Sequence, residues 1–234
     1  MAGNIAGWTE AVRRVSSVDP MPTRILLVRH GQSEWNAAGR WQGQQDPPLT
    51  DLGRRQALAA ADTIGSIEAV FASDLQRAME TATIIASTIG VLPVLVDAGF
   101  RERCAGEWEG LTRAEIEAAW PGYLDAPGDA HVGFATSTPR RPPSWESDEA
   151  VIERAVAALA RVNEHVGNGH ALVVTHGGLI YAIEAHLGQP LGTTGRLANG
   201  AGREVVVDDD GLHLGERFLL VNDDATPVTV PDQI

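Results

Sequence analysis

Short apolar runs and longer amphipathic stretches alternate along the chain from Thr23 onward. The apolar runs are rich in β-branched and aliphatic residues, which is typical of buried strands. The amphipathic stretches follow Ser, Thr or Asp residues that can cap a helix. The pattern predicts strands at 24–29, 68–72, 94–96, 171–175, 203–207 and 212–220, and helices at 50–63, 73–89, 112–119, 148–166 and 178–187.

This alternation predicts an α/β fold, a three-layer α/β/α sandwich with a mostly parallel central sheet. The last two strands are expected to form a hairpin across Asp208–Gly211. Residues 1–22 precede the regular pattern and are expected to form a flexible N-terminal tail, followed by a single domain over residues 23–234. The interval from Gly99 to Ser147 interrupts the alternation, and long irregular insertions of this kind commonly carry function.

A histidine follows an apolar run twice, as His30-Gly31 and as His176-Gly177. Each glycine allows a sharp turn just past the imidazole. If the two strands are parallel neighbours, both imidazoles lie in one crevice. Ligands of open α/β sheets bind outside the carboxyl ends of the strands, so the spacing predicts a catalytic pocket there.

Composition narrows the possible partners. The 234 residues carry a net charge of −13, which argues against a nucleic-acid partner or an anionic membrane surface. Local arginines can still hold a small anionic substrate. Cys104 is the only cysteine, so an intrachain disulfide and a cysteine-rich zinc site are excluded.

The first twenty residues lack the continuous apolar segment of a secretory signal, because Glu10, Arg13 and Arg14 interrupt it. No other run reaches the length needed to cross a membrane. The sequence therefore predicts a cytoplasmic protein. It identifies no interface for a second copy of the chain, and the oligomeric state stays open.

His30 is the strongest candidate for chemistry. A neutral imidazole can attack phosphorus and form a covalent phosphoenzyme, provided that positive charge lies nearby. Arg29 supplies such a charge, and the run Gly31-Gln32-Ser33 can supply backbone N–H groups to phosphate oxygens as the chain turns. The alternative is an ordinary histidine at the edge of the core with a hydrogen-bond partner.

Arg77 lies in the first turn of the predicted helix at 73–89, where the helix dipole disfavours a cation by about 0.3–1 kcal/mol. Such local conflicts tend to occur at functional sites. Arg77 is therefore expected to bind the same phosphate as Arg29. The alternative is a surface ion pair with Glu80, three residues along the helix.

Six segments in order resemble the histidine phosphatase superfamily, in the branch of cofactor-dependent phosphoglycerate mutases and broad-specificity phosphatases. They extend over nearly all of the chain from Thr23 to about Leu187. The segments are LVRHGQSEWN at 27–36, RWQG at 40–43, LTDLG at 49–53, SDLQRA at 73–78, GEWEGLT at 106–112 and THGG at 175–178.

The resemblance implies a role for each matching residue. His30 becomes the phosphorylated nucleophile, and the phosphate pocket is completed by Arg29, Arg77 and His176. The implied substrate-binding residues are Asn36, Gln42, Gly43 and Arg103. The resemblance implies a site that works without a metal ion, and no cofactor is expected.

Glu102 matches the acidic residue that serves as proton donor in the family. The chemistry is reasonable, because a carboxylic acid can protonate the departing alkoxide and the carboxylate can then activate water. Glu107 and Glu109 are competing candidates, and a solvated acidic loop is the alternative for all three.

The resemblance predicts a metal-independent phosphatase acting on small phosphate monoesters, with a phosphoglycerate mutase as the alternative. Arg140 and Arg141 are similar to the paired arginines that mutases direct at substrate, but a charged surface loop explains them equally well. The segment between Gly110 and Trp145 is shorter than the mutase insertion. Water exclusion would decide between transfer and hydrolysis.

Two further classes of function are open on the sequence alone. A metal-dependent phosphohydrolase needs a ligand cluster, and Asp129 with His131 is an unspecific pair for one. A non-catalytic phosphate-binding module has no evident need for two arginines and two histidines around one anion.

Overall fold

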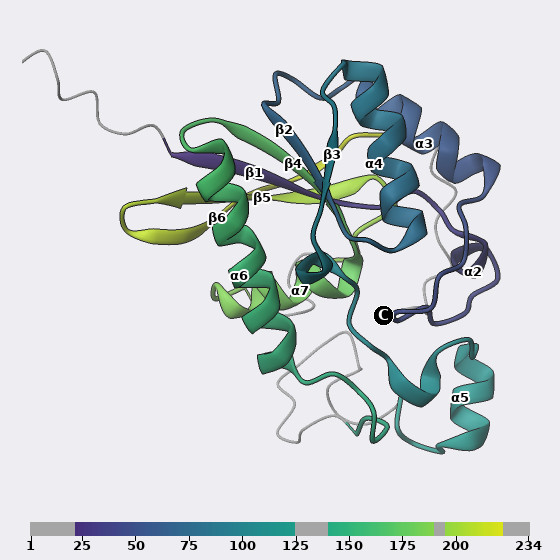
Figure 1. Cartoon of the computed structure of the whole chain (residues 1–234). Helices are drawn as coiled ribbons and strands as arrows, with labels where there is room; N and C mark the ends of the chain where they lie inside the picture. Colours follow the sequence, from purple (N-terminus) through teal and green to yellow (C-terminus); the bar gives the residue numbers. More distant parts are fainter. Residues whose placement is uncertain (1–21, 125–139, 190–194, 222–234) are drawn as a thin grey trace, which may run out of the picture.

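The computed structural model describes residues 22–124, 140–189 and 195–221. A six-stranded sheet of order β3-β2-β4-β1-β5-β6 forms its centre (Figure 1). The first four strands pair in parallel, whereas β5 is antiparallel to both β1 and β6. The strands are β1 Thr23–Arg29, β2 Ala69–Ala72, β3 Val94–Val96, β4 His170–Thr175, β5 Ala201–Asp208 and β6 Gly211–Leu219.

Helices cover both faces of the sheet, as Figure 1 shows. On one face, α3 (Asp51–Ala61) and α4 (Gln76–Ile89) bury small apolar residues against side chains such as Val28 and Val174. On the other face, α6 (Asp148–Val166) and α7 (Gly177–His186) pack on Ile25, Leu27 and Val173. Successive strand residues point to opposite faces, so one strand serves both layers. The predicted three-layer sandwich is confirmed.

The remaining elements are short: α2 (Glu34–Ala37), the 3₁₀ turns η1 (Ala98–Phe100) and η2 (Gly106–Trp108), and α5 (Arg113–Ala119). A small aromatic cluster supports this region, in which Trp41, Trp108 and Trp145 meet edge to face with ring centroids 5.2–6.0 Å apart. It lies beside the sheet rather than inside the main core, and α5 packs onto it through Ile116.

The predicted start of the second helix was wrong. Ser73 and Asp74 do not cap it: α4 begins at Gln76 with Leu75 as its N-cap residue, which makes no side-chain capping bond. The N–H of Gln76 instead donates to Oδ1 of Asp46, 2.7 Å away. A distant loop thus supplies the cap that local sequence rules assigned to the preceding residues.

No helix in the described part of the chain is both long and apolar enough to span a membrane. The expected terminal hairpin is present, with Asp208 paired to Gly211. The expected tail lies outside the described residues, apart from Pro22.

Candidate active site

Two imidazoles meet at the carboxyl edge of the sheet. Arg29 pairs with Thr175 in the parallel register of β1 and β4, so the next residues, His30 and His176, leave the sheet at the same level. Their ring centroids are 5.1 Å apart, with the ring planes inclined by 61°. Both side chains are buried. The predicted meeting of the two imidazoles at the strand ends is confirmed.

The hydrogen bonds of His30 define which nitrogen holds its proton. Nδ1 lies 2.6 Å from the carbonyl oxygen of Gly31, which can only accept, so Nδ1 carries the hydrogen. Nε2 accepts from Nε of Arg77 at 3.2 Å. Burial, reinforced by the positive charges of Arg77 and Arg29, holds the pKa of His30 well below its ordinary value of 6.5. At neutral pH the ring is uncharged, with its lone pair on Nε2.

Arg77 occupies the second position of α4 and is completely buried. Its Nη1 donates to the carbonyl of Gln45 at 2.7 Å, and its Nη2 donates to the carbonyl of Gly43 at 2.9 Å. Burial lowers the pKa of Arg77 to about 10, so it stays charged at neutral pH. The alternative ion pair with Glu80 is absent from the described residues, because Glu80 binds Nε of Arg54 at 2.6 Å.

Arg29 approaches the same site from the end of β1. Its Nη1 donates to the carbonyl of Leu197 at 2.6 Å. The backbone N–H of Leu197 in turn donates to the hydroxyl of Tyr181, also at 2.6 Å. Burial lowers the pKa of Arg29 from its ordinary value. The loop before β5 therefore fixes the guanidinium through carbonyl contacts.

His176 is the N-cap residue of α7 and caps nothing with its side chain. Neither of its ring nitrogens has a hydrogen-bond partner among the described residues, although both are shielded from solvent. Burial and the charge of Arg77 hold the pKa of His176 well below 6.5. Buried polar atoms without partners are costly and rare, so this ring is suited to a ligand that supplies the missing bond.

The charges in the cluster favour an anion. Within the described residues, neither Arg29 nor Arg77 forms an ion pair with a carboxylate. Two buried guanidiniums near two neutral imidazoles leave positive charge without a bound carboxylate in a medium of low dielectric. Phosphate oxygens match both the charge and the donor geometry.

Glu102 borders this cluster with its carboxylate at the first turn of α7. Oε1 accepts the N–H of Arg103 at 2.8 Å, and Oε2 accepts the N–H of Gly178 at 3.1 Å. Gly178 lies two residues after His176, so the carboxylate binds the helix turn that directly follows His176. Glu102 also contributes to the electrostatic environment of Arg29 and Arg77.

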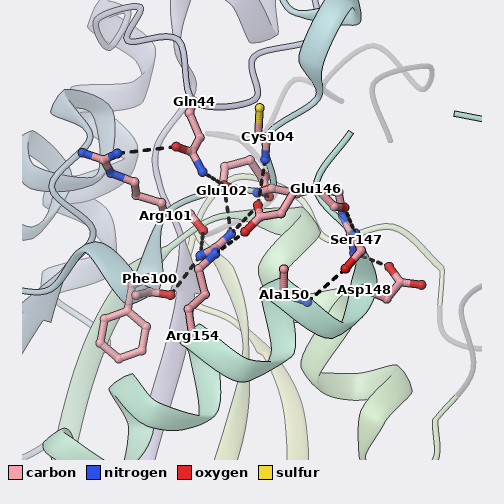
Figure 2. A network of polar contacts seen from close by, with 12 residues as sticks. Gln44, Phe100, Arg101, Glu102, Cys104, Glu146, Ser147, Asp148, Ala150 and Arg154 are labelled. Carbon is pink, nitrogen blue, oxygen red and sulfur yellow. Dashed lines mark hydrogen bonds and ion pairs between the residues drawn. The ribbon is translucent and has the colours of Figure 1, made fainter. Parts of the chain in front are cut away.

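The backbone that carries Glu102 is held by Arg154 of α6, as Figure 2 shows. The Arg154 guanidinium donates to the carbonyls of Gly99 at 2.9 Å, Arg101 at 2.5 Å and Glu102 at 3.1 Å. It also forms an ion pair with Glu146 at 2.7 Å. One partly buried arginine thus fixes the irregular segment that carries Glu102.

The two competing carboxylates are engaged elsewhere. Glu109 accepts the N–H groups of Gln44 at 2.9 Å and Ala105 at 3.0 Å, which ties two loops together. Glu107 accepts the N–H of Ser144 at 3.2 Å and its hydroxyl at 3.0 Å. Both carboxylates hold loop backbone, whereas Glu102 binds the first turn of α7, just after His176.

Asn36, Gln42 and Gly43 follow β1 and support the turn after His30. Oδ1 of Asn36 accepts the N–H of Ser33 at 3.1 Å, and Oε1 of Gln42 accepts the hydroxyl of Ser33 at 2.7 Å. Gly43 touches the cluster directly, through its carbonyl on Arg77. Its φ is +50°, and a Cβ there would lie 2.0 Å from a carboxylate oxygen of Glu109, so glycine is required.

Arg103 lies at the start of α6 rather than against the histidines. Its Nη1 donates to the carbonyl of Glu146 at 2.7 Å, and its Nη2 pairs with Asp148 at 2.6 Å. Its guanidinium also stacks on Trp145, 5.5 Å from the ring centroid. Substrate contact by Arg103 stays a prediction that these bonds do not favour.

The backbone N–H groups after His30 do not face an open phosphate site, as the sequence suggested, because each already has a partner. The N–H of Gly31 donates to Oγ1 of Thr81 at 3.1 Å, and that of Gln32 donates to Oε1 of Gln56 at 2.8 Å. The N–H of Ser33 donates to Asn36, as described above. The turn is held by side chains of α3 and α4, so its amides are already satisfied.

Three residues that support the site were not predicted from the sequence: Gln56, Thr81 and Asn199. The amide nitrogen of Asn199 donates to the carbonyl of His30 at 2.8 Å. Gln56 and Thr81 carried a usable signal, because each is a polar residue on a buried helix face that is otherwise apolar, apart from Arg77 on the helix of Thr81. Asn199 lies in a loop and offered no such pattern.

In the described part of the chain, no three His, Cys, Asp or Glu side chains are grouped so that they could hold a metal ion. Asp129 and His131 lie outside the described residues. Arg140 and Arg141 contact aromatic rings, Arg140 over Tyr123 at 5.9 Å and Arg141 over Trp145 at 4.8 Å.

The chain is similar to known phosphatases. Residues 25–217 match the family model of the histidine phosphatase superfamily, branch 1. A glucosyl-3-phosphoglycerate phosphatase of Mycolicibacterium vanbaalenii is 36% identical over 173 residues, which cover 70% of this chain and 73% of the relative. A metal-independent phosphoserine phosphatase of Arabidopsis thaliana is 35% identical over 201 residues, covering 83% of this chain and 79% of the relative.

A solved structure shows the same architecture. The mycobacterial glucosyl-3-phosphoglycerate phosphatase in complex with VO3 superimposes with a TM-score of 0.69 and 32% identity, covering 82% of this chain and 96% of that one. The family match, the relatives and the fold agree with one another. The chain is an enzyme of the phosphatase type and belongs to branch 1 of the histidine phosphatase superfamily.

Proposed function

We propose that the protein hydrolyses small phosphate monoesters, without a metal ion, through a phosphohistidine formed on His30. The observation that carries the proposal is the state of His30: a neutral imidazole with its lone pair on Nε2, beside two buried cations. Such a ring is an activated nucleophile for a dianionic phosphoryl group. The surrounding donors would stabilise the charge on the transferring oxygens.

In the proposed first step, the substrate phosphate lies between Arg29, Arg77 and His176. The Nε–H of Arg77 leaves Nε2 and turns to a phosphate oxygen, which frees the lone pair. Nε2 then forms a bond to phosphorus as the bond from phosphorus to the ester oxygen breaks. The Nδ1–H bond to Gly31 stabilises the positive charge that develops on the ring. His176 contributes a donor from one of its two unpartnered nitrogens.

Glu102 is the proposed proton donor to the departing alkoxide. Its position supports this role, because its carboxyl group borders the histidine pair and its backbone is fixed by Arg154. In the second step the carboxylate accepts a proton from water, which attacks phosphorus and breaks the bond to Nε2. Inorganic phosphate leaves, and the carboxylic acid and free imidazole are restored.

The proposed substrates are small polar metabolites bearing a phosphate monoester, as the names of the two relatives suggest. Phosphoserine and glucosyl-3-phosphoglycerate are the first compounds to assay. The mutase alternative is less supported. The contacts of Arg140 and Arg141 with aromatic rings give these arginines a structural explanation.

Two predictions from the sequence stay proposals. We propose a division into an N-terminal tail over residues 1–22 and a single catalytic domain over residues 23–234. We also propose a cytoplasmic location, where small phosphorylated metabolites are available. Limited proteolysis with mass spectrometry of the fragments tests the boundary.

The test of function is phosphate release from a panel of monoesters, including 3-phosphoglycerate and 2,3-bisphosphoglycerate, in the presence of EDTA. We expect release of inorganic phosphate that persists in the chelator and disappears in His30→Ala. Isomerisation of phosphoglycerate without net release would replace the phosphatase with a mutase. Loss of activity in EDTA, restored by added metal, would favour a metal-dependent mechanism.

A further inference from the structure

We propose that Gln56 is a positioning residue that sets the tautomer of His30, by fixing the orientation of the peptide between Gly31 and Gln32. The inference rests on the proposed function of His30 as nucleophile, because its consequence for the rate follows from the lone pair on Nε2. Gln56 itself lies on α3 and acts on the ring through the backbone.

Both ends of this peptide are engaged. Its carbonyl oxygen, on Gly31, lies 2.6 Å from Nδ1 of His30, and its N–H, on Gln32, donates to Oε1 of Gln56 at 2.8 Å. The C=O and N–H of a planar trans peptide point in opposite directions. An acceptor that holds the N–H on one side therefore aims the carbonyl at the imidazole on the other side.

The orientation matters because the partner of one ring nitrogen decides the state of the other. If the peptide rotated by half a turn, its N–H would face Nδ1 of His30, and Nδ1 would have to accept. The proton would then move to Nε2, and the lone pair needed for attack would be lost. Gly31 has no Cβ to oppose such a rotation, so the restraint has to come from outside the turn.

The preceding peptide is held independently. Its carbonyl, on His30, accepts from Asn199, and its N–H, on Gly31, donates to Thr81. These bonds fix the backbone on which the ring is mounted, whereas the bond to Gln56 fixes the carbonyl that the ring contacts. Substitution of Gln56 can therefore release the Gly31 carbonyl while the bonds of Asn199 and Thr81 remain.

The first turns of α3 are shaped for this contact. Gln56 is 2% exposed, a polar residue among buried alanines. Gly53 precedes it by one helical turn, and a Cβ on Gly53 would lie 2.1 Å from the carbonyl oxygen of Gln32. A Cβ on Gly31 would lie 2.4 Å from the carbonyl oxygen of Gly53. Two glycines thus bring the helix close enough for the Gln56 side chain to reach the peptide.

The test is the protonation pattern of the His30 ring, read from ¹H–¹⁵N correlations of the ligand-free, full-length protein at neutral pH, with His30→Asn to assign the signals. Four proteins are compared: wild type, Gln56→Met, Gln56→Glu and Ala60→Gly. Methionine keeps the length of the side chain without a strong acceptor. Glutamate keeps an acceptor for the N–H of Gln32. Ala60→Gly weakens the same helix without touching the turn.

We expect wild type and Gln56→Glu to hold the proton on Nδ1, and Gln56→Met to show a clear population protonated on Nε2. The rate constant kcat of Gln56→Met should fall about 10-fold or more with little change in KM, as for other residues that orient a functional imidazole. Ala60→Gly should keep the wild-type ring signals. Gln56→Leu replaces Gln56→Met if the methionine variant does not fold.

A folded Gln56→Met or Gln56→Leu protein with the wild-type ring signals would overturn the proposal, as would an equal change in Ala60→Gly. The spectra require no substrate, so they test the role of Gln56 even if the phosphatase assay fails. Conversely, loss of the Nδ1 signal in Gln56→Met would support the positioning role of Gln56. If the wild-type protein is inactive at the same time, that inactivity would count against the proposed function.

Discussion

The carboxylate of Glu102 lies against the first turn of α7 with no room for a side chain at Gly178. Oε2 of Glu102 accepts the N–H of Gly178 at 3.1 Å, and a Cβ on Gly178 would lie 2.4 Å from Oε1. Real Cβ contacts this short do not occur, so the glycine and the carboxylate depend on each other. The contact places the proposed proton donor two residues from His176.

Gly178→Ala should displace Glu102 and reduce the hydrolysis of alkyl phosphates, by about 10-fold to 100-fold in kcat/KM. The formation of phosphohistidine from 4-nitrophenyl phosphate should change much less, because its leaving group needs no proton. Steady-state and burst kinetics with both substrates measure the difference. In a Glu102→Ala background the glycine substitution should add little further loss. Equal losses in both backgrounds would show that Gly178 acts independently of Glu102.

His176→Leu should abolish most activity without destabilising the ligand-free protein. Both ring nitrogens are buried without partners in the described residues, and such groups cost about 1–3 kcal/mol. An apolar side chain of similar size removes that cost. Urea denaturation should therefore give an unchanged or larger free energy of unfolding. A loss of several kcal/mol would mean that the ring stabilises the fold through an interaction that the structure does not contain.

Inorganic phosphate should stabilise the protein, because it supplies the anion that Arg29 and Arg77 lack in the described structure. At a concentration 100 times its Kd, a ligand that binds only the folded state adds about 2.7 kcal/mol. Thermal unfolding with and without phosphate measures this effect. Arg29→Gln should remove most of the shift. Arg161→Gln, at an exposed ion pair with Asp97, should keep it. Equal shifts in the two variants would argue against the proposed pocket.

The stability of the ligand-free protein should fall as the pH falls below 6.5. The pKa values of His30 and His176 are both lowered in the folded state, chiefly by burial, whereas the unfolded chain titrates near 6.5. Between the folded and unfolded pKa values the unfolded state binds more protons, so each histidine costs up to about 1.4 kcal/mol per pH unit. Urea denaturation across this range should show a smaller slope in His176→Leu than in wild type. An unchanged slope would contradict the assigned pKa direction.

Much of this organisation was predictable from sequence, because it depends on local pattern and topology. The apolar runs before His30 and His176 predict two parallel strands, and the parallel register then brings the imidazoles together. Arg77 stood out because it conflicts with the dipole of its own helix. Both inferences use physical rules that act over a few residues, and the structure confirms the arrangement that they predict.

The details that depend on distant contacts were not predictable in the same way. The cap of α4 comes from Asp46, thirty residues away, which no local rule identifies. The choice among Glu102, Glu107 and Glu109 follows from loop geometry that Arg154 fixes from α6. Gln56 satisfies the turn amide that the sequence analysis assigned to phosphate. In each case the decisive hydrogen bond comes from a residue far away in the sequence, which local sequence rules do not identify.

The most direct test of the central claim is to identify the phosphorylated residue in rapidly quenched enzyme. Wild-type protein mixed with a monoester that it hydrolyses should carry acid-labile phosphate. Mass spectrometry under alkaline conditions should place this phosphate on His30. With 4-nitrophenyl phosphate, whose leaving group needs no proton, the Glu102→Gln variant should accumulate more of it, because its water activation is impaired. Phosphate release at the wild-type rate with no phosphoenzyme, or with the label on a residue other than His30, would contradict the account.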